Sequence, residues 1–159
     1  MLKHIFKQGT NKAKPTLLLL HGTGGTEQDL LPLGDLIDPE ASVLSVRGEV
    51  LENGMPRFFR RLAEGIFDEQ DLVFRTEQLN AFLDEASQQY GFDRSNMVAI
   101  GYSNGANIAA SLLFHFNDVL KARLFYYFTS IGLYNFTSGF LSWNQRSAKS
   151  FSNRNAYCS

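Results

Sequence analysis

A ten-residue stretch decides the fold of this chain: Met97-Val98-Ala99-Ile100-Gly101-Tyr102-Ser103-Asn104-Gly105-Ala106. Its first four residues form a short apolar run, which is typical of a buried strand. Apolar residues recur at helical spacing over residues 104–116, so the chain must turn sharply at Ser103 between a strand and a helix. The flanking glycines at 101 and 105 leave room for such a strained turn. We therefore expect the Ser103 hydroxyl above the end of a sheet, where the dipole of the following helix favours developing negative charge.

A glycine-rich turn after an earlier apolar strand completes the pattern. The strand is expected over residues 16–20, and the turn follows it as His21-Gly22-Thr23-Gly24-Gly25. A serine that attacks a carbonyl needs two backbone N–H groups aimed at the oxyanion, and we expect these donors to be Thr23 and Asn104. A plain tight turn and a dinucleotide-binding loop are the rival interpretations. Glu27 stands where a third glycine of a dinucleotide loop belongs, and no Gly-Lys-Ser/Thr follows, which disfavours phosphate binding.

Apolar strands alternate with helices along the first 120 residues. We expect strands at residues 2–6, 16–20, 42–46 and 97–100, helices at 27–37, 71–90 and 104–116, and irregular structure over 47–65. Because the strands are apolar throughout, the alternation predicts an α/β fold with a mainly parallel sheet and helices on both faces. Asp68, Glu69 and Asp71 are expected to begin the second helix, and Gly91 to end it.

Several motifs in combination resemble the bacterial carboxylesterase/phospholipase family of α/β-hydrolases, which is related to the acyl-protein thioesterases and dienelactone hydrolases. They are His21-Gly22-Thr23-Gly24-Gly25, Arg47-Gly48, Asn53-Gly54, Arg57-Phe58-Phe59 and Gly101-Tyr102-Ser103-Asn104-Gly105-Ala106. The resemblance covers residues 1 to about 121 and implies the α/β-hydrolase fold, no cofactor, a cytoplasmic enzyme, and hydrolysis of small carboxylic esters or thioesters. It also implies that the segment 53–66 borders the active site. We expect these residues to line the substrate pocket: His21, Gly22, Gly24, Arg57, Phe58 and Tyr102.

An acid and a histidine partner for Ser103 are not evident in the sequence. In this fold an Asp or Glu and then a His follow the nucleophile, whereas here His115 precedes Asp118. His115 lies about 18 Å from Ser103 by helical rise and cannot serve as its base. His4 is expected at the surface. His21 is the histidine expected nearest to Ser103, and we favour a structural role for it, because a base also needs an orienting partner.

The composition changes after about residue 120. The first 120 residues carry a net charge of −6, whereas the last 39 contain no acidic residue, carry +5 and hold 10 of the 21 aromatic residues. We predict a partial α/β-hydrolase domain over residues 1–120, with its C-terminal strands missing or aberrant, and an atypical basic, aromatic and serine-rich tail over 121–159. An interaction tail and a sequence read out of frame both fit this composition, and we favour the second.

Other features bear on partners and location. The net charge of −1 gives no electrostatic reason to expect nucleic acid or an acidic membrane surface. A lone cysteine, Cys158, excludes an internal disulfide and favours a reducing compartment. We expect no signal peptide, and polar residues and glycines interrupt the uncharged segment 124–145, so we expect no membrane span. The histidines and the cysteine lack metal-ligand spacing, so no metal site is predicted.

Two groups of side chains near the expected active-site border have alternative interpretations. Arg57, Arg60 and Arg61 would suit an acidic substrate group, although a solvated loop face is favoured. Phe58 and Phe59 are expected to belong to the core or the pocket wall rather than to stack on a ligand.

The sequence thus predicts a serine hydrolase of small-molecule esters or thioesters, with activity impaired because an evident Asp and His are absent. A non-catalytic binding protein and an unstable truncated fragment are the alternatives, and a homo-oligomer remains open.

Overall fold

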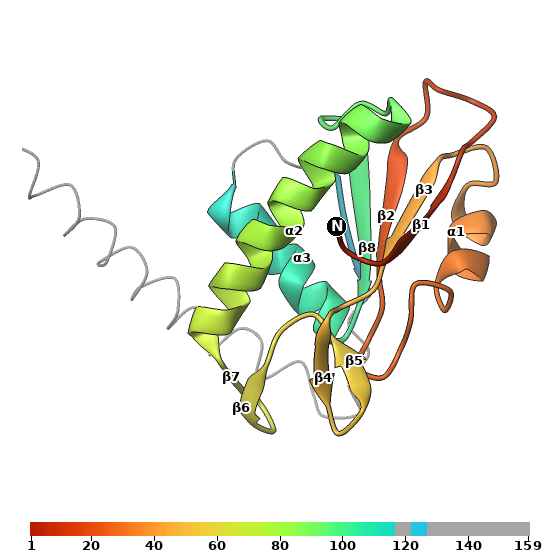
Figure 1. The fold of residues 1–159 in the computed structure, drawn as a ribbon. Helices are drawn as coiled ribbons and strands as arrows, with labels where there is room; N and C mark the ends of the chain where they lie inside the picture. Colours follow the sequence, from red (N-terminus) through yellow and green to blue (C-terminus); the bar gives the residue numbers. More distant parts are fainter. Residues whose placement is uncertain (117–121, 127–159) are drawn as a thin grey trace, which may run out of the picture. The chain divides into compact units, whose positions relative to one another are not determined.

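The central sheet is built from the apolar segments that the sequence predicts as buried strands. A computed structural model describes residues 1–116 and 122–126 of the chain (Figure 1). The strands lie in the order β1 (His4–Lys7), β3 (Val43–Val46), β2 (Thr16–Leu20), β8 (Met97–Tyr102) and β9 (Ala122–Tyr126). All neighbouring pairs are parallel except β1 and β3, so the predicted mainly parallel sheet is confirmed.

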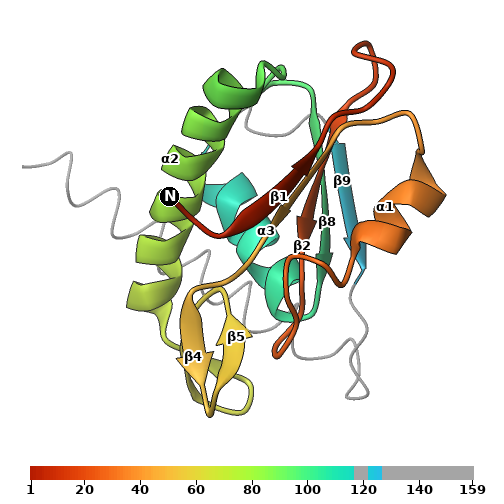
Figure 2. The same ribbon diagram turned by 45° about the vertical axis from the view of Figure 1, so that its right-hand side comes forward.

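Helices cover both faces of this sheet because neighbouring residues on a strand point to opposite faces. Leu17 and Leu19 of β2 pack on the side of α1 (Leu31–Ile37). Leu18 and Leu20 join the larger core formed with α2 (Glu69–Tyr90) and α3 (Asn104–His115). Figure 2 shows α1 on one side of the strands and α2 and α3 on the other. All of β2 is buried, which explains why its sequence is apolar without alternation.

Local chemistry determines where the helices begin and end. The Asp68 carboxylate accepts a hydrogen bond from the Asp71 N–H at 3.1 Å and caps α2, while Gly91 ends the helix with φ of 68°. Both predicted ends of α2 are therefore confirmed. The helix predicted from residue 27 begins only at Leu31, since residues 27–30 form turns. Pro32 lies in its first turn, where the missing N–H would have no partner in any case.

Residues 47–65, predicted to be irregular, contain two short antiparallel hairpins, so that prediction is wrong. The first hairpin joins β4 (Val50–Glu52) to β5 (Met55–Arg57), and the second joins β6 (Arg61–Ala63) to β7 (Ile66–Phe67). Asn53 and Gly54 have φ of 52° and 79°, the positive values that a tight two-residue hairpin turn requires. The β4–β5 hairpin lies at the end of the sheet where β2 and β8 finish (Figures 1 and 2).

The segment predicted as an atypical tail begins with a strand of the same sheet. β9 runs parallel to β8, with Tyr126 opposite Tyr102, and lies in one compact unit with the rest of the described chain. The remainder of the predicted tail, including most of the uncharged segment 124–145, lies outside the described residues. Among the described helices, none has the length and apolar character needed to cross a bilayer.

Replacing Leu18 by Ala tests the assignment of the core. Leu18 is 0% exposed in the central part of β2, so its truncation should lower the free energy of unfolding by about 2–5 kcal/mol. Leu36→Ala removes the same atoms from a side chain that is 81% exposed, and should change stability by less than about 0.5 kcal/mol. Urea unfolding followed by circular dichroism compares the two variants, and similar losses would contradict this core.

Candidate active site

Ser103 occupies a strained turn between β8 and α3. Its φ of 51° and ψ of −111° lie in a region that residues with a side chain rarely adopt. Its carbonyl oxygen accepts from the N–H groups of Ala106 (3.0 Å) and Asn107 (3.1 Å), which starts the helix directly after the turn. The serine side chain makes no capping hydrogen bond. The strand, sharp turn and helix expected around Ser103 are all present.

Backbone crowding accounts for the glycines around this turn. A Cβ on Gly105 would overlap the carbonyl oxygen of Leu20, because the first turn of α3 packs directly on the end of β2. A Cβ on Gly101 would lie 2.6 Å from the Cα of Ala106. On the facing segment, a Cβ on Gly22 would lie 2.5 Å from the Tyr102 ring. The glycine-rich turn after β2 is therefore in contact with the residue that precedes Ser103.

The two N–H groups expected to bind an oxyanion are not used by the described part of the protein. Asn104 is the first residue of α3, so its N–H has no helical carbonyl to bond. Thr23 is exposed, and among residues 1–116 and 122–126 no hydrogen bond from its N–H is found. It lies between Gly22, which contacts Tyr102, and Gly24, whose N–H donates to the carbonyl of Pro56 at 2.9 Å. Neither N–H group therefore has a hydrogen-bond acceptor among the described residues.

His21 is held in a neutral form by its backbone neighbours. The side chain is buried, its Nε2 accepts from the Gly48 N–H at 3.0 Å, and its Nδ1 donates to the Gly22 carbonyl at 2.6 Å. Burial lowers the pKa of His21 and outweighs the Gly22 carbonyl and Asp29, which favour the charged form. With both ring nitrogens committed, His21 has none left to take a proton from Ser103, which supports the structural role favoured from the sequence.

The remaining apolar members of the expected pocket differ in exposure. Tyr102 is 42% exposed beside the glycine-rich turn and can meet a ligand. Phe58 is buried, and its ring centroid lies 4.8 Å from that of His21. Phe59 is fully buried in the main core. The expectation that the two phenylalanines belong to the core or pocket wall is therefore confirmed.

The three arginines next to this segment have different environments. The Arg57 side chain is only 4% exposed and bonds both the Glu52 carboxylate and the Phe59 carbonyl, so the favoured solvated-face interpretation is wrong for it. Arg57 is the last residue of β5, opposite Val50 in the hairpin. Arg61 also bonds Glu52, at 2.8 Å, and the exposed Arg60 pairs with Asp68 at 3.2 Å. Each of these charges already has a carboxylate partner.

The other two histidines have partners away from Ser103. His115 is the last residue of α3, as expected, and its Nδ1 lies 2.8 Å from the Ser111 carbonyl. His4 is half-buried against Phe82, with its Nε2 2.8 Å from the hydroxyl of Tyr90 at the end of α2, so its predicted surface position is wrong. The described residues contain no group of three or more His, Cys, Asp or Glu side chains placed to hold a metal.

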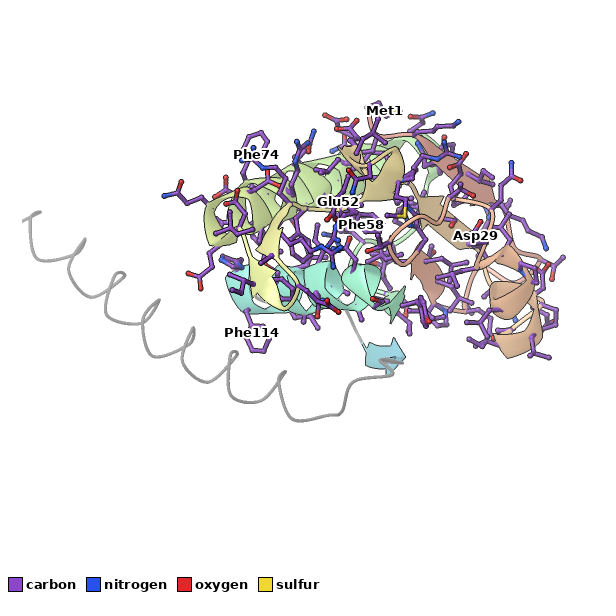
Figure 3. All side chains as sticks on the ribbon, turned by 90° about the horizontal axis from the view of Figure 1, so that it is seen from below. Met1, Asp29, Glu52, Phe58, Phe74 and Phe114 are labelled. Atoms are coloured by element: carbon purple, nitrogen blue, oxygen red, sulfur yellow. The ribbon has the colours of Figure 1, made fainter. Side chains whose placement is uncertain are left out.

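Two contacts that the sequence does not predict join this site to residues 56–58, at the end of the β4–β5 hairpin. Pro56 accepts from Gly24, and the side-chain oxygen of Asn104 accepts from the Phe58 N–H at 2.7 Å. The dipeptide Asn53-Gly54 is a strong hairpin signal and would have predicted the hairpin, though not these bonds. Figure 3, which looks at the molecule from below, shows Phe58 between the hairpin and the start of α3.

A polar hollow of about 580 Å³ lies elsewhere, between β4 and the first turns of α2. Its walls include Asp71, whose carboxylate pairs with Arg75 at 3.4 Å and with Arg60 at 3.7 Å. Of the segment 53–66 only Arg60 lines it, and neither Ser103 nor the expected oxyanion and pocket residues do. We place the candidate site at Ser103, because an open hollow of paired charges offers no reacting group.

Comparison with known proteins gives relatives that are longer than this chain. The protein named "Putative hydrolase MhqD" of Bacillus subtilis (strain 168) is 61% identical over 126 residues, which are 79% of this chain and 62% of MhqD. The crystal structure of the Bacillus cereus carboxylesterase is 71% identical, with a TM-score of 0.77 over 79% of this chain and 59% of that one. A carboxylesterase from Mesorhizobium loti is 31% identical, with a TM-score of 0.67 over 70% and 53% of the two chains. No family model matches the sequence. The chain therefore spans about three fifths of the length of MhqD and of the Bacillus cereus enzyme.

Gly105→Ala tests the close approach of α3 and β2. Alanine forms helix better than glycine by about 1 kcal/mol, yet its Cβ would overlap the Leu20 carbonyl, so we expect a net loss of about 1–3 kcal/mol. Gly34→Ala in α1 is the matched control, since its Cβ would meet the flexible end of Leu19 at 3.2 Å and the Val43 side chain at an ordinary contact distance of 3.5 Å, and no backbone atom of another element lies closer. Thermal unfolding measures both. A Gly105→Ala protein as stable as the unchanged chain would contradict the packing described.

The buried His21 predicts a pH dependence of stability. Because its pKa is lowered in the folded state from the ordinary 6.5, the unfolded chain binds this proton more readily. The stability that His21 contributes is complete above about pH 6.5 and is lost as the pH falls through the folded-state pKa. We expect the difference in unfolding free energy between the unchanged chain and His21→Gln to shrink between about pH 7.5 and pH 5.5. A difference that is constant over this range would show that His21 does not titrate in this way.

Proposed function

We propose that this chain, which over 126 residues is 61% identical to MhqD and belongs with it to the carboxylesterase-like α/β-hydrolases, acts on carboxylic esters with Ser103 as nucleophile. One observation carries the proposal. A serine with φ of 51° joins a buried strand to a helix, directly beside a glycine-rich turn. That strained conformation is costly and is kept where a side chain must project from the end of a sheet. The carboxylesterase relatives support an ester as the substrate class.

The chemistry follows from the groups around Ser103. The Ser103 Oγ attacks the ester carbonyl carbon, and the carbonyl oxygen gains negative charge. The N–H groups of Thr23 and Asn104 bind that oxyanion, and the N-terminal end of α3 adds its favourable dipole. The bond to the alcohol oxygen then breaks, and the alcohol leaves with the proton that the Ser103 hydroxyl gives up. Water then hydrolyses the acyl-serine, which releases the carboxylic acid and returns a proton to the Ser103 oxygen. A thioester reacts in the same way with a thiol as leaving group.

We further propose that the 159-residue chain turns over slowly. In its sequence His115 and Asp118 are the only histidine and acid after Ser103, and they occur in the wrong order for the triad. His115 is held one helix length away, and His21 has no available nitrogen. Loss of the base typically costs several orders of magnitude in rate, whereas an intact oxyanion hole retains some catalysis over water.

The substrate and location remain proposals of the same kind. Phe58, which is expected in the pocket wall, and the half-exposed Tyr102 would suit a small apolar acyl group. The lone Cys158 is consistent with the cytoplasm. The competing possibility is a protein that binds esters without cleaving them, which the missing base would favour.

Ser103→Ala distinguishes these functions. We expect the unchanged chain to release nitrophenol from a short nitrophenyl ester at about 10⁻² s⁻¹ or less, against about 10 s⁻¹ for a typical enzyme. Ser103→Ala should abolish the remaining reaction, and Ser87→Ala, which changes a partly exposed serine on α2, should leave it unchanged. Acyl-serine formation is followed by mass spectrometry of the intact chain. Turnover at the ordinary rate would overturn the impairment, and a complete lack of acylation at Ser103 would favour the binding function.

A further inference from the structure

We propose that the side chain of Asn104 is a positioning residue that ties the start of α3 to the β4–β5 hairpin and so aligns the two oxyanion donors. The inference rests on the proposed function of Ser103. It concerns the amide side chain of Asn104, whereas the proposed mechanism uses only the backbone N–H of that residue.

The first part of this arrangement is a buried hydrogen bond. Asn104 is 2% exposed, and its Oδ1 accepts from the Phe58 N–H at 2.7 Å. The side chain and the backbone N–H of Asn104 share one Cα, so holding the side chain also restrains the direction of the N–H. Phe58 is 46 residues earlier in the sequence, and the bond therefore connects α3 to a separate structural element.

The second part is a bond from the same short stretch to the other donor segment. The Pro56 carbonyl accepts from the Gly24 N–H at 2.9 Å, and Gly24 directly follows Thr23. Residues 56–58 therefore hold the glycine-rich turn at one end and α3 at the other. Of the two proposed donors, Asn104 itself bonds this stretch through its side chain, and Thr23 is next to Gly24, which bonds it through its N–H.

Packing alone would not fix the directions of the donors. The contacts of Gly22 with Tyr102 and of Gly105 with Leu20 limit how closely the two segments approach. Hydrogen bonds weaken steeply when they bend, so the bonds to Pro56 and Phe58 add the directional restraint that an oxyanion hole requires.

The stretch 56–58 is itself held firmly. A Cβ on Gly48 would overlap the backbone of Arg57, and the Phe58 ring packs on His21, whose Nε2 bonds the Gly48 N–H. The buried Arg57 is anchored to Glu52 on the other strand of the hairpin. A support that is fixed on several sides can transmit a restraint to the donors.

A neutral amide suits this position better than a carboxylate. Asp would also offer an oxygen to the Phe58 N–H, but it would place a negative charge on the residue whose N–H must bind an oxyanion. The side chain of Asn104 supplies the acceptor without that charge. Its Nδ2 is buried and has no partner among the described residues, so in the described structure only the oxygen of this amide is used for the tie.

Three variants of the full chain test the proposal. Asn104→Ala removes the tie and keeps the backbone donor, Asn104→Asp keeps an acceptor oxygen, and Asn107→Ala is the matched control. Asn107 lies on the same helix, and its Oδ1 has no hydrogen-bond partner among the described residues. Hydrogen exchange at the Phe58 and Gly24 amides reports the tie, and Ser103-dependent hydrolysis of a nitrophenyl ester reports the donors.

In Asn104→Ala we expect exchange at both amides to rise about tenfold or more, and kcat to fall about 10- to 100-fold with KM changed less than about threefold. Asn107→Ala should change neither amide exchange nor kcat. Asn104→Asp keeps the acceptor oxygen, so the Phe58 and Gly24 amides should stay protected while its added charge lowers kcat. Loss of that protection in Asn104→Asp would overturn the tie, also where Asn104→Ala does not fold.

The positioning role and the proposed function fail separately. Unchanged exchange at Gly24 in Asn104→Ala, or an unchanged kcat, would overturn the positioning role alone. A loss shared equally with Asn107→Ala would also overturn it, since that result marks a general effect on α3. Hydrolysis by the unchanged chain that does not depend on Ser103 would instead overturn the proposed function.

Discussion

The packing of the first turn of α3 directly on the end of β2 is the constraint on which the other features of the site depend. Gly105 permits this contact because any larger residue would meet the Leu20 carbonyl. With the helix held there, the chain leaving β8 enters it through a sharp turn with positive φ at Ser103. Such a conformation costs about 1–3 kcal/mol in isolation, and the buried surroundings of β2 and β8 offset that cost. The strained backbone conformation of Ser103 thus follows from backbone packing. No contact of the Ser103 side chain is needed to hold it.

The same end of the sheet collects the segments that follow three parallel strands. Loops at the carboxyl ends of parallel strands meet there, which is why such ends carry binding sites in α/β folds. His21 joins the segment after β2 to Gly48 after β3. The buried Glu27, bonded to Arg47, makes a second connection between the same two segments. Burial alone would raise the pKa of Glu27, but its hydrogen bonds and the Arg47 charge lower it overall, so the carboxylate remains ionised as this connection requires.

Sequence patterns predicted those parts of the molecule whose cause is local. The strand at 16–20 follows from a run of buried leucines, the ends of α2 follow from Asp68 and Gly91, and the turn at Ser103 follows from its small neighbours. The hairpin at 50–57 was not predicted, although Asn53 and Gly54 together favour the positive φ values of a two-residue turn. Long-range contacts could not be predicted in this way. Nothing near Arg57 in the sequence indicates that it is buried against Glu52, and nothing near Asn104 indicates a bond to Phe58.

Stabilisation of the oxyanion and activation of the nucleophile depend on different parts of the chain. The glycine contacts and hydrogen bonds found around Ser103, Thr23 and Asn104 in the described part of the chain join β2, the β4–β5 hairpin, β8 and α3. The base that would take the serine proton comes from none of these elements, since His21 is occupied by Gly22 and Gly48. Stabilisation of the oxyanion depends on donors fixed in advance, whereas activation of the nucleophile depends on a proton acceptor. In the proposed mechanism the first therefore depends on the N-terminal strands together with α3, and it can exist in a chain in which the second is weak.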